Sequence, residues 1–234
     1  MLDFDPNDPF PLVPEDRFSY AQEQLHSAQV DEWLGLRTSL CEAKISSVYT
    51  QSNAHPNAHP HAPPLDQNLW IGLPVRTLLT PYLEIRRILD RLGLEPRSRV
   101  VDLGAGYGRM GFVMARHHPE AEFIGYEYVS ERVNEGQQAL ERTRSPKRVR
   151  LLQADLKSLD FAPDDADAYF IYDFGSRLAI EKCLQDLRAV ARIRPIQVIG
   201  RGRASRDAIE REHPWLSQVI PPIHGRQVSI YRSG

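Results

Sequence analysis

Residues 99–112 read Arg-Val-Val-Asp-Leu-Gly-Ala-Gly-Tyr-Gly-Arg-Met-Gly-Phe. An apolar, β-branched run leads into three alternating glycines and then into a helical pattern, which predicts a strand, a tight turn and a helix. Glycines at 104, 106 and 108 allow the backbone to turn sharply and to approach a ligand where a Cβ atom would collide. The N-terminus of the following helix faces the same place, so we expect a ligand site at this turn.

The sequence after Pro81 repeats this alternation of short strands and amphipathic helices. It predicts helices over 82–93, 108–117, 130–143, 176–192 and 206–212, and strands over 99–103, 122–127, 149–153, 168–172, 196–200 and 227–231. Such alternation is typical of an α/β fold with a doubly wound, mostly parallel sheet and crossover helices. We expect the last strand to run antiparallel near the sheet edge.

The composition indicates one globular domain, or one domain with an appendage. The chain has 234 residues, of which 41% are hydrophobic and 26% charged, with a net charge of -2. These values disfavour a coiled rod, a disordered tail and a binder of bulk polyanions. The sequence contains no run of about 20 apolar residues for a membrane span and no basic signal peptide. We expect Cys41 and Cys183 to be small core residues and the protein to be cytoplasmic.

The first third of the chain differs in composition and periodicity from the rest. Ten of the 18 prolines fall within residues 1–81, where they bracket a helix-like stretch over 15–48 with one apolar side. The run over 51–64, QSNAHPNAHPHAPP, predicts an exposed linker. Its histidines, His55, His59 and His61, have no carboxylate or thiolate nearby, so we predict no metal site. We therefore divide the chain into a helical and proline-rich appendage, 1–70, and a ligand-binding domain, 71–234.

Acidic residues accompany three successive strands. Asp102 precedes the glycine turn, Glu127 ends the second strand, where we expect it outside the core, and Asp155 follows the third. The third glycine of a dinucleotide fingerprint would occupy position 109, where Arg109 stands, so the spacing disfavours NAD. A carboxylate at Asp102 would repel a pyrophosphate and attract a cationic amino group. An acid at the position of Glu127 is where ribose hydroxyls are bound in related folds.

In order, spacing and strand context, these residues resemble the class I S-adenosylmethionine-dependent methyltransferase family over about residues 80–234. The resemblance implies a seven-stranded Rossmann-like sheet and S-adenosylmethionine as the cofactor. It implies that Asp102 and the turn hold the amino acid portion, Glu127 the ribose, and Asp155 with Leu156 the adenine. The cofactor-binding residues expected on this basis are Asp102, Gly104, Ala105, Gly106, Tyr107, Gly108, Glu127, Tyr128, Asp155 and Leu156.

The family places residues that meet the methyl acceptor after the fourth strand, here in Phe170-Ile-Tyr-Asp-Phe-Gly-Ser. We expect Tyr172 and Asp173 to have catalytic roles, with Asp173 accepting a proton from an amine or orienting it. A helix cap or a loop contact is the alternative role of Asp173. The segment lacks the Asn-Pro-Pro-Tyr or Asp-Pro-Pro-Tyr motif of enzymes that methylate planar nitrogens, which disfavours adenine, cytosine and glutamine.

Three short segments, 104–109, 125–127 and 174–175, are similar to those of small protein-lysine methyltransferases. The expected function is therefore methyl transfer to a nucleophile, with a protein side-chain amine favoured as the acceptor. The alternatives are an RNA or small-molecule methyltransferase, or a catalytically silent fold that binds a partner. The oligomeric state stays open.

Two further groups of residues have a functional and a structural interpretation. Trp70, Thr77 and Tyr82 lie in a region that covers the cofactor in similar enzymes, although Trp70 could equally be a packing residue. Arginines around the fifth strand could form a positive face, with Arg201 and Arg203 on one side, or a solvated surface. These arginines are Arg192, Arg194, Arg201, Arg203, Arg206 and Arg211.

Overall fold

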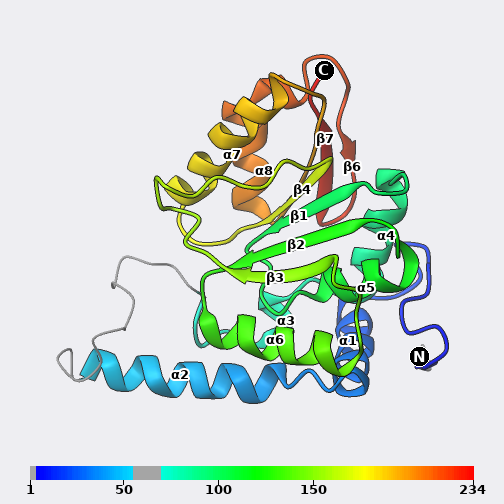
Figure 1. The fold of residues 1–234 in the computed structure, drawn as a ribbon, viewed down its shortest axis with the longest axis vertical. Coiled ribbons are helices and arrows are strands. Elements are labelled where there is room, and N and C mark those ends of the chain that lie inside the picture. Colours follow the sequence, from blue (N-terminus) through cyan, green and yellow to red (C-terminus); the bar gives the residue numbers. More distant parts are fainter. Residues whose placement is uncertain (1–3, 55–69) are drawn as a thin grey trace.

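The computed structural model describes residues 4–54 and 70–234, and its centre is a seven-stranded sheet (Figure 1). The strand order is β3-β2-β1-β4-β5-β7-β6. The first five strands pair in parallel, whereas β7 is antiparallel to both β5 and β6. The predicted doubly wound, mostly parallel fold is therefore confirmed. The strands are β1 (Arg99–Leu103), β2 (Glu122–Glu127), β3 (Val149–Gln153), β4 (Ala168–Tyr172), β5 (Gln197–Arg201), β6 (Ile223–His224) and β7 (Val228–Arg232).

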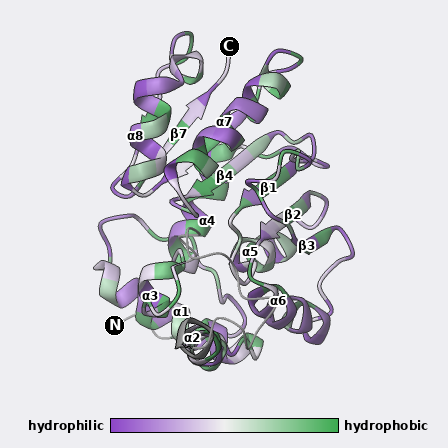
Figure 2. Ribbon diagram, turned by 90° about the vertical axis from the view of Figure 1, so that its left-hand side faces the viewer, coloured by the Kyte–Doolittle hydropathy of each residue, from purple (hydrophilic) through white to green (hydrophobic). Residues whose placement is uncertain are grey.

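Helices cover both faces of the sheet. One face carries α4 (Tyr82–Leu92), α5 (Arg109–His117) and α6 (Ser130–Arg142); the other carries α7 (Arg177–Ala191) and α8 (Arg203–Glu212) (Figure 1). Neighbouring strand residues belong to different cores, because successive side chains of a strand point to opposite faces. Val100 packs in the core with α4 and α5, and Val101 packs in the core with α7. The outward faces of α6 and α7 are hydrophilic (Figure 2).

Local signals account for most helix ends. Pro81 precedes α4, and Gly93 ends it in the left-handed conformation, at φ 62°. Ser176 caps α7 by accepting a hydrogen bond from the N–H of Ala179. The predicted strands and helices after Pro81 agree with the structure to within a few residues. Strand β6, helix α3 (Val75–Leu78) and the 3₁₀ turn Pro214–Leu216 were not predicted, because such short elements show no periodicity.

The N-terminal region forms two helices in place of the expected single stretch over 15–48. They are α1 (Tyr20–Leu34) and α2 (Thr38–Ala54), separated at Gly35, which has φ 69°. The predicted start of the linker at 51 is also wrong, because the backbone of 51–54 continues α2. The rest of the predicted linker, with His55, His59 and His61, lies outside the described residues. No helix in the described part of the chain is long and apolar enough to cross a membrane.

Helices α1 and α2 share a hydrophobic core with the sheet. Helix α1 contacts α4, and α2 contacts α6. Phe10, Val30, Leu34 and Ile45 belong to the same buried cluster as the apolar residues of α4 and α5. Cys41 also lies in this cluster, and both cysteines are free and buried, as expected. The division into an appendage, 1–70, and a ligand-binding domain, 71–234, stays a prediction. In the structure, one hydrophobic core contains residues from both parts.

Three buried ion pairs connect the same helices to the sheet region. Glu23 pairs with Arg87 at 2.8 Å, Asp31 with Arg109 at 2.5 Å, and Glu42 with Arg132 at 2.7 Å. All six side chains are buried. In each pair the acid comes from α1 or α2 and the arginine from α4, α5 or α6. Loss of either partner would leave a buried charge without its counterion.

The substitution Asp31→Asn tests this dependence. It leaves Arg109 buried beside a neutral group, so we expect the free energy of unfolding to fall by about 3–5 kcal/mol. Urea unfolding followed by circular dichroism measures the change. Glu120→Gln, at an exposed residue, is the control and should change stability by less than about 0.5 kcal/mol. A similarly small effect of Asp31→Asn would show that the fold does not depend on this ion pair.

Candidate functional site

A cavity lies at the carboxyl edge of the parallel strands, where ligands bind in open α/β sheets. It brings together seven of the predicted site residues: Gly104, Gly106, Glu127, Tyr128, Asp155, Leu156 and Tyr172. The remaining lining residues come from the segment before α4, from α6, from the loops after β3 and β4, and from the first turn of α7. They are Trp70, Leu78, Leu79, Arg132, Lys157, Phe174, Gly175, Ser176 and Ala179.

The glycine turn requires glycine on two grounds. Gly104, Gly106 and Gly108 have φ values of 92°, 56° and 75°, which side chains rarely adopt. A Cβ atom on Gly104 would lie 2.7 Å from Cβ of Phe174, and one on Gly106 would lie 3.0 Å from Cδ2 of Leu79. The turn therefore leaves no room for side chains between its backbone and the residues that cover it.

Three predicted residues of the turn are not among those that line the cavity. The side chain of Tyr107 is fully buried and donates its hydroxyl hydrogen bond to Glu42. Ala105 packs against Gly125 of β2, and Gly108 caps α5. Their contribution to the site is to shape the backbone of the turn.

Glu127 joins the end of β2 to the turn. Its Oε2 accepts the N–H of Gly106 at 2.9 Å, and its Oε1 accepts the N–H of Val129 at 2.9 Å. Glu127 is 6% exposed, so the expectation that it lies outside the core is wrong. The reason is that two backbone donors draw the carboxylate inward while it still lines the cavity.

Asp102 is a buried carboxylate in β1, two positions before the turn. Burial, together with the negative charge of Glu127, raises its pKa to about 8. No group in the described part of the chain donates a hydrogen bond to its carboxylate or forms an ion pair with it. A buried acid in this state fits a cationic ligand group, because an opposite charge would restore the ionised form.

Asp155 and Leu156 shape the other end of the cavity. Oδ1 of Asp155 accepts the N–H of Lys157 at 3.0 Å, which fixes the carboxylate in a turn. Leu156 is buried and supplies apolar surface. Lys157 was not predicted, because a lone lysine in a loop carries no pattern.

Asp173 does not line this cavity. The N–H and hydroxyl groups of Ser205 donate to its Oδ1 at 2.7 and 2.8 Å, and the N–H of Ala204 donates to its Oδ2 at 3.3 Å. Both residues lie in the first turn of α8, so Asp173 caps that helix. The expected role as a proton acceptor is not supported, because these donors occupy the carboxylate. The sequence could not show this, since α8 lies about 30 residues further along the chain.

The segment before α4 is fastened over the cavity. Nε1 of Trp70 donates to the carbonyl oxygen of Asp173 at 2.7 Å, and the hydroxyl of Tyr172 donates to the carbonyl oxygen of Thr77 at 2.8 Å. Thr77 thus contributes its backbone, and Leu78 and Leu79 provide the apolar cover. Tyr82 is not part of a lid: it is fully buried and donates to Asp31, because α4 faces α1 at that point.

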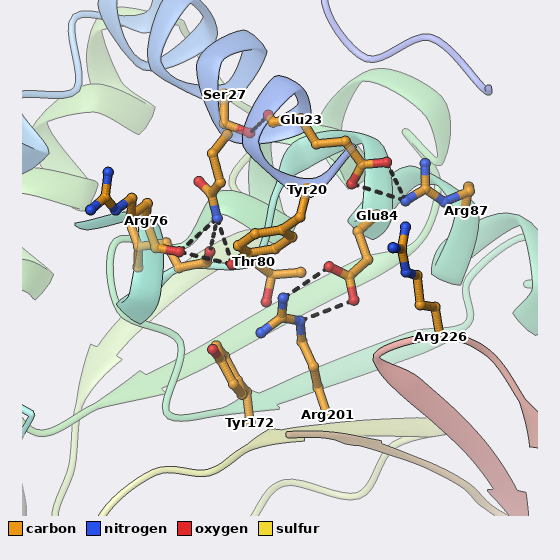
Figure 3. Close-up of polar contacts among 12 residues, drawn as sticks. Tyr20, Glu23, Ser27, Arg76, Thr80, Glu84, Arg87, Tyr172, Arg201 and Arg226 are labelled. Carbon is orange, nitrogen blue, oxygen red and sulfur yellow. Dashed lines mark hydrogen bonds and ion pairs between the residues drawn. The ribbon is translucent and has the colours of Figure 1, made fainter. Parts of the chain in front are cut away.

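Helix α1 holds the same segment from the other side (Figure 3). Nε2 of Gln24 donates to the carbonyl oxygens of Arg76 and Leu79 at 2.8 and 3.0 Å. The hydroxyl of Tyr20 also donates to the carbonyl oxygen of Arg76, at 2.8 Å. The cover of the cavity is therefore positioned by the N-terminal region.

Of the two alternatives for the arginines around β5, the structure does not show a positive face that includes both Arg201 and Arg203. Arg201 is 3% exposed, and its Nε and Nη2 donate to Glu84 at 3.0 and 2.9 Å (Figure 3). Its guanidinium also lies 4.1 Å from the centre of the Tyr172 ring. The side chain of Arg203 is 89% exposed. Strand alternation does not relate the two residues, because β5 ends at Arg201 and α8 begins at Arg203.

Comparisons with known proteins identify the domain. The family model described as "Methyltransferase domain" matches residues 100–193. That range begins in β1 and includes the glycine turn, Glu127 and Asp155. No curated protein sequence matches the chain significantly.

Solved structures with a similar fold have low sequence identity. YcgJ from Bacillus subtilis is 21% identical, with 50% of each chain covered and a TM-score of 0.38. An RNA methyltransferase from Salinibacter ruber in complex with S-adenosyl-L-homocysteine is 19% identical, with 66% of this chain and 92% of that chain covered and a TM-score of 0.48. PKMT2 from Rickettsia typhi in complex with AdoHcy is 17% identical, with 46% and 21% covered and a TM-score of 0.40. The chain thus spans half, nine tenths and a fifth of these proteins.

The sheet, the glycine turn and the acids at successive strand ends define a Rossmann-like methyltransferase domain. The match of residues 100–193 to a methyltransferase domain agrees with the expected resemblance to class I S-adenosylmethionine-dependent methyltransferases. The residues present fit this cofactor, because Glu127 and Asp155 line the cavity and the turn excludes side chains beside it. Asp102 is a buried acid without a cationic partner, although it is not among the lining residues. When bound, the cofactor supplies a methyl group on a sulfonium, which is already activated for transfer. No cluster of metal-ligating side chains occurs among residues 4–54 and 70–234.

Different residues of the chain would bind different parts of the cofactor. Asp102 would pair with its amino group, Glu127 would accept its ribose hydroxyls, and Asp155 with Leu156 would contact its adenine. Leu79, Phe174 and Trp70 line the cavity with apolar surface, which would favour alignment of the acceptor with the methyl group.

The state of Asp102 predicts a pH dependence of binding. At pH 6–8 the carboxyl must lose a proton before it pairs with a cationic amino group, because its pKa is about 8 without ligand. We expect the affinity for S-adenosylhomocysteine to rise with pH over this range, by up to about tenfold per unit. Titration calorimetry in buffers of different ionisation enthalpy measures both the affinity and the proton release.

Asp102→Asn is the control for this prediction. The asparagine cannot ionise, so we expect weaker binding that no longer depends on pH between 6 and 8. An affinity of the unmodified protein that is constant over that range would show that Asp102 does not pair with the cofactor.

Proposed function

We propose that the protein transfers the methyl group of S-adenosylmethionine to the amine nitrogen of a protein side chain, with lysine favoured. One observation carries the proposal: Trp70, Tyr172 and Phe174 together line the cavity at the end of β4. Aromatic rings attract ammonium groups, so they stabilise the methylated, cationic product. The apolar surroundings also lower the pKa of an incoming amine, which favours its nucleophilic form.

The two residues expected to be catalytic, Tyr172 and Asp173, are both engaged in hydrogen bonds, which agrees with an amine acceptor. Asp173, the acid that follows β4, caps α8. Burial raises the pKa of Tyr172, whose hydroxyl already donates to Thr77. An amine that loses its proton on entering the cavity needs no protein base. Alignment of the nitrogen with the methyl group and the sulfur then accounts for much of the rate.

A second cavity supports a large acceptor. It has a volume of about 720 Å³ and meets the first one at Tyr172. Its walls come from α1, from the segment around Arg76 and from the ends of β4 and β5. Leu25, at its rim, is 61% exposed and offers apolar surface to a partner. We assign this groove to the polypeptide that carries the amine.

We also propose a cytoplasmic location. Cys41 and Cys183 are free and buried in the described structure, which suits a reducing compartment.

Methylation of a cell lysate tests the acceptor class. The purified protein is incubated with methyl-labelled S-adenosylmethionine and lysate, and the product is divided between protease and nuclease treatments. We expect protease to release the label and hydrolysis of the labelled protein to yield methylated lysine. Label that nuclease releases would replace the proposal with an RNA acceptor. Cofactor binding without any labelling would indicate a silent fold.

Trp70→Leu tests the aromatic lining. We expect the labelling rate to fall by about 2- to 30-fold, equivalent to about 0.5–2 kcal/mol, because an aromatic face next to the ammonium is lost. Trp33→Leu is the matched control, since Trp33 is a half-exposed tryptophan of α1 that does not line the cavity. Equal rates for the two variants would argue against a cationic product at this place.

A further inference from the structure

Two grooves meet at Arg76, in the segment before α4. The first is the groove that we assign to the polypeptide with the amine, here called the acceptor groove, and it shares Tyr172 with the cofactor cavity. The second has a volume of about 820 Å³ and is lined mainly by α1, α2 and residues 72–76. Gln24 and Arg76 line both grooves. A polypeptide that delivers an amine past Tyr172 would therefore lie beside Arg76.

The backbone of Arg76 is fixed, whereas its side chain is available to a partner. Its carbonyl oxygen accepts hydrogen bonds from the hydroxyl of Tyr20 and from Nε2 of Gln24, both at 2.8 Å (Figure 3). The carbonyl oxygen of the next residue, Thr77, accepts the hydroxyl of Tyr172 at 2.8 Å. Arg76 is exposed, and its guanidinium forms no hydrogen bond or ion pair with any residue that the structure describes. The fold thus holds a cation at a defined place in the groove wall.

The other charged residues of the acceptor groove have their charges compensated. Arg201 is buried and donates two hydrogen bonds to Glu84. Asp173 accepts three hydrogen bonds from the first turn of α8, where the helix dipole also favours a negative charge. Among the described residues that line the groove, Arg76 therefore carries the one charge without a counterpart. Its guanidinium matches a carboxylate, which it can bind through two parallel hydrogen bonds.

We propose that Arg76 is a specificity-determining residue, which selects acceptor polypeptides that carry an aspartate or glutamate close to the methylated lysine. The selection rests on the proposed function, because it concerns the residues around that lysine. Ala21 and Leu25 of α1 are exposed and line the same groove. Their apolar surface suits the side chains of a polypeptide, whereas the phosphate backbone of RNA is bound mainly by cationic and polar groups.

A library of synthetic peptides tests this preference. Each peptide has one central lysine, flanked on both sides by positions that are glutamate or glutamine at random. The library is incubated with the protein and S-adenosylmethionine, and mass spectrometry compares the methylated with the unmethylated peptides. We expect glutamate to be enriched about three- to tenfold over glutamine at one or more positions, because an ion pair with Arg76 stabilises the bound peptide. Glutamate and glutamine have nearly the same size, so the ratio isolates the charge.

Substitutions of Arg76 show whether this residue causes the preference. We expect Arg76→Gln to remove the enrichment and Arg76→Glu to favour glutamine over glutamate, because like charges repel. Arg76→Lys should retain part of it, since the charge stays and the planar fork is lost. Both products of each ratio come from the same reaction, so a change in stability or cofactor affinity does not alter it. Arg188→Gln is the matched control and should keep the enrichment, because Arg188 is an exposed arginine of α7 that lines neither groove.

The outcomes separate this role from the proposed function. Equal methylation of the glutamate and glutamine peptides, or an enrichment that Arg76→Gln retains, overturns the role of Arg76 and leaves lysine methylation standing. If only proteins of the lysate are methylated, the residues that flank their methylated lysines are compared among the same variants, with the same order expected. Methylated lysine in neither the library nor the lysate, or label that nuclease releases, overturns the proposed function and the role of Arg76 with it.

Discussion

Buried arginines that need counterions are the constraint on which the rest of this structure depends. Arg87, Arg109 and Arg132 lie on the helices of one sheet face, and their acids come from α1 and α2. A guanidinium that is removed from water without an acid beside it costs several kcal/mol. The N-terminal helices are therefore required by the charges of the methyltransferase domain, in addition to the apolar surface that they cover.

The same helices shape the cofactor cavity. Helix α1 holds the segment that places Leu79 over the glycine turn, and α2 supplies the carboxylate that binds Arg132. In this chain the cavity therefore receives its cover and part of its charge balance from helices outside the sheet. The cavity wall and the groove proposed for the acceptor both depend on where α1 lies.

Burial, and the hydrogen bonds that compensate for it, determine the properties of the acids at the site. Asp102 and Glu127 are two acids in a dry region, and only Glu127 has backbone donors to compensate its charge. Asp102 consequently has a raised pKa and suits a cationic ligand. Asp173 differs from Asp102, since three hydrogen bonds from the first turn of α8 hold its carboxylate in a structural role.

The sequence by itself determined the sheet, the turn and the acids at the strand ends. Strand and helix periods, glycines at positive φ and caps such as Ser176 act over a few residues, so they can be read in order along the chain. Only the tertiary structure decided that Tyr82 is a core residue, that Asp173 caps α8 and that Arg201 pairs with Glu84. These roles depend on which residues far apart in the chain meet, and a buried charge takes the nearest partner that folding brings to it.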